Sequence, residues 1–313
     1  MFQLGVAVMA WIVGGAFMAT ELRRPDPFGF IIVAVTLFLI IQFAYVALQT
    51  TGVLSVGVLE AGGETLARVR GTFHHPGNLG KALYAMLLLT LPALISRVRR
   101  TRLLAVFSLA MILVMIGLSY SRANMVAVAA TLVVWAICSP GQHAARRFLT
   151  LLILAIIALP FVDALVARFE SDPEGGVRPQ VWEAAMQQLS QNPLFGTGPN
   201  AFIAEVGQWN SSVALGYPVH NSFVLLAAEL GVLGALAYFA PQLGAWFSAA
   251  RMWFTRRATP ASSAVLASAP GILAIGWTGW GLIDQPYLSL WFLAMGMLVA
   301  MMRSDRKGAD EHR

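Results

Sequence analysis

The chain alternates between apolar segments of about twenty residues and shorter polar connections. An α-helix of about 20 residues crosses the hydrocarbon core of a bilayer, which is about 30 Å thick. The pattern therefore predicts an all-α, polytopic membrane protein in which lipid is the main solvent. We expect about nine spans, at roughly residues 2–20, 28–50, 79–96, 103–119, 123–139, 147–163, 220–247, 262–283 and 287–302.

The basic residues between these spans predict the orientation of the chain. If every span crosses the membrane, 15 of the 21 Lys and Arg residues fall on one side. Positive charge is retained in the cytoplasm, so we expect an extracytoplasmic N-terminus and a cytoplasmic C-terminus. The remaining cations lie on the extracytoplasmic side: Arg68, Arg70, Lys81, Arg122, Arg168 and Arg178.

Composition agrees with a membrane protein, since 58% of the residues are hydrophobic, 12% are charged and the mean hydropathy is +0.70. The net charge of +6 does not indicate nucleic-acid binding, because the basic residues are spread between spans. The single Cys138 cannot form an intramolecular disulfide. The first apolar run has no basic segment before it, so we expect a retained span and no cleaved signal peptide.

Two connections are long, residues 51–78 and 164–219, and both lie on the predicted periplasmic side. Chemistry is therefore expected there. In the second loop, Pro179–Leu189 predicts a surface helix. Its predicted apolar face consists of Val181, Trp182, Ala185, Met186 and Leu189. The turn-forming residues between Asn192 and Pro199 end this helix.

Polar residues at the periplasmic ends of spans are the candidates for chemistry: Arg70, His74, His75, Asn78, Lys81, Arg122, Asn124, Arg178, His220, Asn221 and Asp284. Arginines at such positions can simply extend to the interface. Arg122 and Arg178 nevertheless run against the charge bias, and Arg122 occupies a very short turn. Guanidinium groups match phosphate oxygens in a forked geometry. Arginines beside apolar walls therefore favour a lipid-linked diphosphate as the ligand.

His220 begins a long apolar segment, where an imidazole can accept a proton from an attacking hydroxyl. The alternative is a histidine that caps or anchors the helix. Adjacent His74 and His75 do not predict a metal site, because neighbouring loop histidines do not easily face one ion. Glu229, about 13 Å further along the helix, is interpreted as structural. No nucleotide-binding loop or serine nucleophile elbow occurs.

Four segments carry a resemblance to a known family. They are Arg-Gly-Thr-Phe-His-His-Pro-Gly-Asn at 70–78, Ser-Tyr-Ser-Arg-Ala at 119–123, residues 178–182 followed by Asn-Pro-Leu-Phe-Gly-Thr-Gly-Pro-Asn at 192–200, and His-Asn-Ser-Phe at 220–223 followed by Glu-Leu-Gly at 229–231. In this order they resemble the O-antigen ligase and polymerase superfamily, whose members transfer or polymerise undecaprenyl-diphosphate-linked glycans. The resemblance covers roughly residues 66–300.

The resemblance implies a GT-C-like helical glycosyltransferase of the bacterial inner membrane, with the loop at 164–219 as a periplasmic lid. Arg122 and Arg178 would bind the donor diphosphate, Arg70 would assist, and His220 would act as the base. We expect further substrate contacts from His74, Asn78, Lys81, Asn200 and Asn221. The resemblance implies no metal and no cofactor. Its implied partners are a polyprenyl-diphosphate-linked glycan and a glycan, lipid or protein acceptor, with no nucleic acid.

The expected organisation is an N-terminal part at 1–65, a ligase-like membrane domain at 66–302 and a cytoplasmic tail at 303–313. Family members usually have about twelve spans, so we expect a short or N-terminally truncated member. Two other classes stay open: a transporter or flippase for a lipid-linked or anionic solute, and a non-catalytic subunit of an envelope polysaccharide assembly complex.

Overall fold

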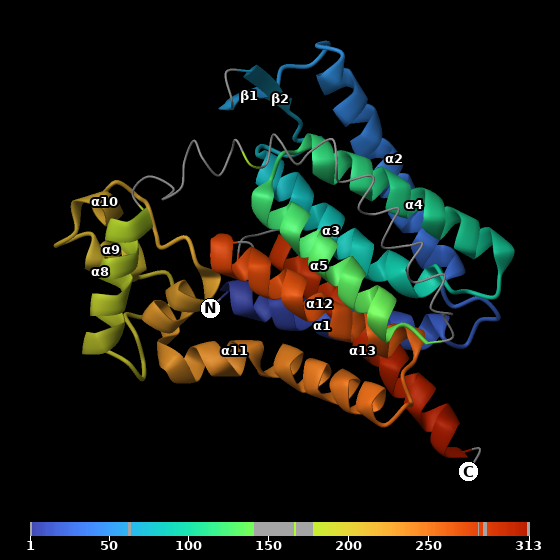
Figure 1. The fold of residues 1–313 in the computed structure, drawn as a ribbon. Helices are drawn as coiled ribbons and strands as arrows, with labels where there is room; N and C mark the ends of the chain where they lie inside the picture. Colours follow the sequence, from blue (N-terminus) through green and yellow to red (C-terminus); the bar gives the residue numbers. More distant parts are fainter. Residues whose placement is uncertain are drawn as a thin grey trace.

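The computed structural model describes residues 2–61, 64–140, 166, 178–280, 282–283 and 287–311. Helices dominate this part of the chain (Figure 1). The elements are α1 (Phe2–Glu21), α2 (Gly29–Thr50), β1 (Gly57–Ala61), β2 (Glu64–Arg68), α3 (Pro76–Ala93), α4 (Arg99–Leu118), α5 (Arg122–Cys138), α8 (Arg178–Gln191), α9 (Phe202–Val206), α10 (Ser211–Ala214), α11 (Ser222–Phe254), α12 (Pro260–Thr278) and α13 (Tyr287–Glu311).

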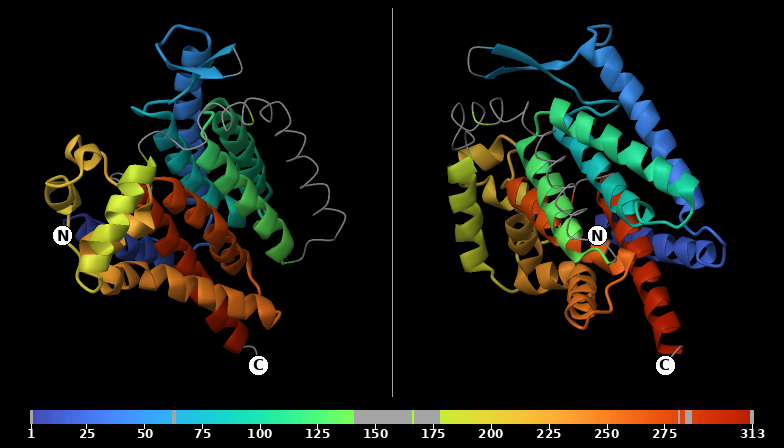
Figure 2. Two further views of the ribbon diagram at one scale, coloured as in Figure 1. Left: turned by 60° about the vertical axis from the view of Figure 1, so that its left-hand side comes forward. Right: turned by 45° about the vertical axis from the view of Figure 1, so that its right-hand side comes forward.

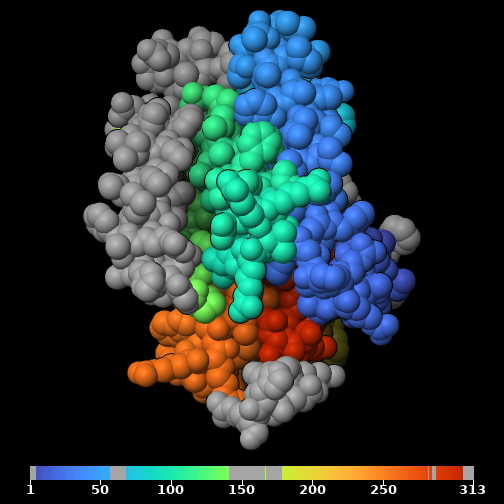
Figure 3. All heavy atoms as spheres, turned by 90° about the vertical axis from the view of Figure 1, so that its right-hand side faces the viewer, coloured from blue at the N-terminus to red at the C-terminus, as the bar shows by residue number. Residues whose placement is uncertain are grey.

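The predicted helical membrane fold is confirmed. The span predicted at 147–163 lies outside the described residues, and a helix occupies each of the other predicted spans. Five of the described helices are long and apolar enough to cross a membrane: α2, α4, α11, α12 and the Tyr287–Asp305 part of α13. Side chains of α2, α4, α11 and α13 share one face of the molecule (Figure 3). Exposed apolar residues such as Leu37 and Phe247 suit contact with lipid.

Other features of the chain were not predicted. Strands β1 and β2 pair antiparallel into a small hairpin beyond the end of α2 (Figures 1 and 2). Helix α11 continues to Phe254, beyond the end of the span predicted at 220–247. Helix α12 ends at Thr278, before the end of the span predicted at 262–283. Helix α13 continues to Glu311, into the segment at 303–313 that we expected to be a cytoplasmic tail. Arg, Lys, Glu and Ala favour helices, so a helix can continue after its apolar pattern has ended.

Helix α3 lies in the core of the bundle, with nearly all of its side chains buried. The hydroxyl of Tyr84 in α3 donates to the carbonyl of Ser268 in α12 (2.9 Å) and shares a hydrogen bond with the hydroxyl of Thr131 in α5 (2.9 Å). Gly271 of α12 leaves room for these two side chains. A buried hydroxyl is costly without a partner, so this network fixes α3, α5 and α12 against one another.

Helix α1 packs along α13 through glycines that allow their backbones to approach closely. A Cβ atom on Gly14 would collide with the carbonyl oxygen of Leu293, and one on Gly296 would collide with that of Trp11. The rings of Trp11 and Phe292 meet edge to face, with centroids 6.1 Å apart. Small residues at helix crossings are typical of membrane proteins, because van der Waals packing holds helices together there.

Gly14→Ala is expected to destabilise the protein by about 1–3 kcal/mol, because the added methyl group overpacks the contact between α1 and α13. Gly5→Ala is the matched control on the same helix, since nothing lies within 4 Å of a Cβ placed at Gly5. Thermal unfolding in detergent measures both variants. Equal unfolding midpoints would contradict the close packing.

Candidate functional site

Helix α11 is broken at Gly231, and the loop that follows α8 fills the break. Gly231 has a φ of +71°, which favours glycine. A Cβ atom on Gly231 would collide with the backbone of Leu194. The loop supplies partners for backbone groups on both sides of the break. The bonds run from Val232 N–H to Pro193 O (2.9 Å), from Thr197 N–H to Ala228 O (2.9 Å) and from Gly198 N–H to Glu229 O (2.8 Å).

The carboxylate of Glu229 holds the next part of this loop. It accepts hydrogen bonds from the backbone amides of Asn200 and Phe202. Asn200 has a φ of +60°, a conformation that Asn tolerates better than most residues. Phe202 begins α9, and its side chain is buried. These contacts agree with the structural role expected for Glu229, which connects α11 to the segment between α8 and α9.

Helices α8, α9 and α10 form a small unit beside the start of α11, here called the lid (Figure 2). Helix α8 covers the predicted surface helix and extends it at both ends. The predicted apolar face is only partly right, because Val181 and Ala185 are buried whereas Trp182 and Met186 are exposed. The ring of Trp182 instead lies 6.0 Å from that of Trp277, at the end of α12. The lid therefore contacts the bundle through an aromatic pair.

His220 lies between the lid and the bundle, just before α11. Its ring packs against Trp280, with centroids 4.5 Å apart, and Nε1 of Trp280 donates to the carbonyl of Val219 (2.8 Å). Burial, and then the positive charge of Arg178, lower the pKa of His220, while the carbonyl of Pro218 opposes this shift. A pKa below its usual value near 6.5 leaves the imidazole neutral at pH 7.

Two neighbouring polar atoms at this position are buried. Neither Nδ1 of His220 nor Nδ2 of Asn221 forms a hydrogen bond of ordinary geometry within the described part of the chain. Asn221 caps α11 through Oδ1, which accepts from the amides of Phe223 and Val224 (3.0 Å each). Because buried polar atoms normally have partners, these two nitrogens are candidates for contact with a bound ligand.

The segment that contains Arg70 is fastened to α2 by two glutamines. Gln49 Oε1 accepts from the amides of Arg70 and Gly71 (3.0 Å each), and its Nε2 donates to the carbonyl of Gly71 (2.9 Å). Gln42 Oε1 accepts from the amide of Thr72 (3.0 Å), and its Nε2 donates to the hydroxyl of Thr72 (2.9 Å). Buried amide side chains in an apolar helix therefore position the loop before α3.

Several polar residues gather at the start of α3. His75 caps the helix through Nδ1, and partial burial followed by the charges of Arg68 and Lys81 lowers its pKa. Lys81 donates to Oδ1 of Asn78 (3.2 Å), and its Nζ lies 5.2 Å from the centroid of the Tyr287 ring. Positive charge is thus concentrated beside an aromatic ring.

Arg122 begins α5 next to this group. In the same helix turn, Nδ2 of Asn124 donates to the carbonyl of Gly77 in α3 (3.0 Å) and to the hydroxyl of Ser121 (2.9 Å). Asn124 also occupies the space where a side chain on Gly80 would lie. The starts of α3 and α5 are therefore in direct contact, with Arg122 at their shared end.

The predicted site residues form two groups. The first, at the starts of α3 and α5, holds Arg70, His74, Asn78, Lys81 and Arg122. His74 is exposed, and its carbonyl accepts from Nη1 of Arg70 (3.3 Å). The second, at the start of α11 and in the lid, holds Arg178, Asn200, His220 and Asn221. Helix α12 links the groups, because it packs along α5 and the hydroxyl of Ser222 donates to the carbonyl of Gly279 (2.6 Å) at its end. Arg168 and Asp284 lie outside the described residues.

Two other observations concern where ligands can bind. A cavity of about 780 Å³ lies near the C-terminal end of α11, and none of the predicted site residues lines it. Within the described residues, no three His, Cys, Asp or Glu side chains are grouped as metal ligands would be. Neither observation adds a metal or a cofactor to the candidate site.

Sequence reasoning missed three residues that shape the site. Trp280 packs against His220, and Gln42 and Gln49 hold the loop of Arg70. The glutamines did leave a signal, since polar side chains within an apolar span usually have a specific partner. Trp280 left a weaker one, because aromatic residues are common at the ends of spans.

The fold and its two polar groups define a multi-pass helical membrane protein with a lid over one end. Residues 107–239 match the family model described as O-antigen ligase. This match covers less than half of the chain, and over that part the chain is similar to O-antigen ligases. Comparison with curated proteins finds no match. Together with the apolar helices, this match supports a multi-pass protein of the bacterial inner membrane.

Glu229→Ala is expected to destabilise the protein, because two backbone amides lose their acceptor at about 1–3 kcal/mol each. Glu229→Gln is expected to lose less, since its amide oxygen still accepts. Glu183→Ala, on the exposed face of α8, is the control. Chemical unfolding in detergent measures all three variants, and equal losses from the two alanine variants would refute the role assigned to Glu229.

Arg178→Gln is expected to raise the pKa of His220 towards its usual value, because one of the two causes that lower it is removed. The imidazole then becomes protonated at a higher pH, so the acidic limb of the pH profile of any His220-dependent activity shifts to higher pH. Arg178→Lys keeps the charge and should leave the pKa nearly unchanged. Histidine-selective NMR, assigned with His220→Gln, measures the titration; identical pKa values in the wild type and Arg178→Gln would rule out the electrostatic coupling.

Proposed function

We propose that the protein transfers a glycan from undecaprenyl diphosphate to an acceptor hydroxyl at the periplasmic face of the inner membrane. The observation that carries the proposal is the position of His220, which packs on Trp280 and is close enough to Arg178 for that charge to lower the imidazole pKa, inside the segment that matches the O-antigen ligase model. A neutral imidazole accepts a proton, and a guanidinium binds phosphate oxygens. In glycosyl transfer from a diphosphate, the first group can serve as the base and the second can stabilise the leaving group.

In the proposed reaction, the acceptor oxygen attacks the anomeric carbon of the lipid-linked sugar and forms the new glycosidic bond. The bond between that carbon and the diphosphate oxygen breaks, and undecaprenyl diphosphate leaves with its electron pair. His220 receives the proton of the acceptor hydroxyl. Arg122 and Arg178 bind the diphosphate as its negative charge develops, and Arg70 assists.

The proposed substrate contacts come from both groups of polar residues. Lys81 and Asn78 are hydrogen-bonded to each other at the start of α3, where they would meet the donor headgroup with His74. Asn221 has a buried amide nitrogen available as a donor, and Asn200 presents an exposed side chain in the lid. Arginines neutralise the leaving group, so the proposed reaction requires no metal.

The periplasmic location rests on charge. The basic residues of the candidate site belong to the smaller set of cations, whereas the larger set lies in the connections at the other ends of the spans. Positive charge is retained in the cytoplasm. We therefore propose that the candidate site opens to the periplasm and that the C-terminus is cytoplasmic.

A transporter is the alternative that the break in α11 raises, because transporters often bind solutes at the ends of broken helices. In this chain, however, the carbonyls of Ala228 and Glu229 at the break already accept hydrogen bonds from the loop at 193–198. The break is filled by the chain itself, which favours a structural role for it.

His220→Ala and Arg122→Ala are expected to reduce glycan transfer by about 100-fold or more, because they remove the base and a diphosphate ligand. Both proteins should still accumulate in membranes. Arg97→Ala, at the opposite end of the bundle, should transfer at the wild-type rate. Purified variants incubated with polyprenyl-diphosphate glycan and acceptor provide the measurement, and wild-type transfer by both site variants would refute the mechanism.

A further inference from the structure

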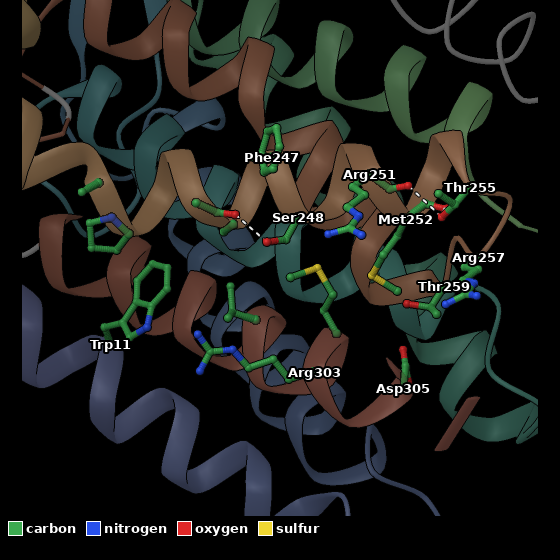
Figure 4. A pocket seen from close by; sticks show the side chains of 16 residues that line it. Trp11, Phe247, Ser248, Arg251, Met252, Thr255, Arg257, Thr259, Arg303 and Asp305 are labelled. Carbon is green, nitrogen blue, oxygen red and sulfur yellow. Dashed lines mark hydrogen bonds between the residues drawn. The ribbon is translucent and has the colours of Figure 1, made fainter. Parts of the chain in front are cut away.

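The cavity of about 780 Å³ is separate from the candidate site. It lies between α11, α13 and α1, near the C-terminal end of α11 (Figure 4). His220 precedes the N-terminal end of the same helix. The volume of the cavity falls within the range of about 300–1,000 Å³ that is typical of ligand sites. Two kinds of wall enclose it, one basic and one apolar.

The basic wall offers donors for an anion. Arg251 of α11 and Arg303 of α13 reach into the space between their helices from opposite sides (Figure 4). Neither guanidinium group has a hydrogen bond or an ion pair with the residues that the structure describes. Arg257 also lines the cavity. A set of arginines around one space matches a phosphate group in charge and in geometry.

One acidic residue accompanies the three arginines that line the cavity. Asp305 is the only carboxylate among the lining residues, and it is hydrogen-bonded to the side chain of Thr259. Thr259 caps the start of α12, where the helix dipole is positive. The cavity therefore retains an excess of positive charge.

The apolar wall continues towards the lipid-facing surface. Trp11, Met252 and Val299 line the cavity, and Phe247 at its edge is 74% exposed. In a membrane protein such an exposed aromatic residue contacts acyl chains. An amphiphile fits both walls, with its phosphate at the arginines and its chains along α11.

We propose that this cavity binds the headgroup of an anionic phospholipid from the leaflet opposite the candidate site. Arg251 and Arg303 hold the phosphate, and the apolar wall receives the upper part of the acyl chains. A bound lipid in this position bridges α11 and α13, and through α13 it supports α1. The proposal is independent of glycan transfer.

The test compares phosphatidylglycerol with phosphatidylcholine of the same acyl chains, added to the purified full chain in detergent. Phosphatidylglycerol should raise the thermal unfolding midpoint of the wild type, and phosphatidylcholine should raise it much less. In the double variant Arg251→Gln and Arg303→Gln, the apparent affinity for phosphatidylglycerol should fall about tenfold or more, because charge-assisted hydrogen bonds are lost. The double variant Arg99→Gln and Arg100→Gln removes the same charge outside the cavity and should respond like the wild type.

A second variant keeps every charge and fills the cavity. Nothing lies within 4 Å of a Cβ on Gly244, which lines the cavity, so Gly244→Leu should fold while weakening the response to phosphatidylglycerol. An equal response to both lipids, an equal loss in the Arg99 and Arg100 control, or an undiminished response in Gly244→Leu would overturn the proposal. Inorganic phosphate alone producing the same stabilisation would also overturn it, because the site would then bind the free anion.

Discussion

The closure of the break in α11 is the constraint on which the candidate site depends. Backbone amides and carbonyls without partners cost several kcal/mol each in an apolar environment. At Gly231 the loop between α8 and α9 supplies those partners, and Glu229 holds the following residues. The lid and the helix therefore form one structural unit. Arg178 is the first residue of α8 in the lid, and His220 precedes α11. The same contacts therefore set the position of the Arg178 guanidinium relative to the His220 imidazole.

Polar side chains within the apolar helices carry out a similar function elsewhere. Gln42 and Gln49 position the loop of Arg70, and Tyr84 ties three helices together. Asn124 joins the starts of α3 and α5. In each case a polar side chain finds specific hydrogen-bond partners, since solvation by water is absent there. Apolar packing holds the bundle together, and these few hydrogen bonds decide which helix ends meet.

The two ends of the bundle present arginines in different surroundings. Near the lid, a guanidinium lies close to the imidazole of His220 and to two buried nitrogens that form no hydrogen bond of ordinary geometry with the described residues. At the other end, arginines border a cavity whose remaining wall is apolar. Phosphate suits both settings. Only the first adds a group that can accept a proton, which is why we place chemistry there and simple lipid binding at the opposite end.

The sequence by itself determined the membrane class, most span positions, the helix in the lid and the resemblance to O-antigen ligases, because apolar length and local motifs suffice for these. It also singled out Arg178, which runs against the charge bias, and His220, which begins a long apolar segment. Only the tertiary structure decided that Trp280 packs on His220, that Trp182 is exposed and that Glu229 holds the lid. Those facts depend on contacts between residues far apart in the chain, which no local periodicity encodes.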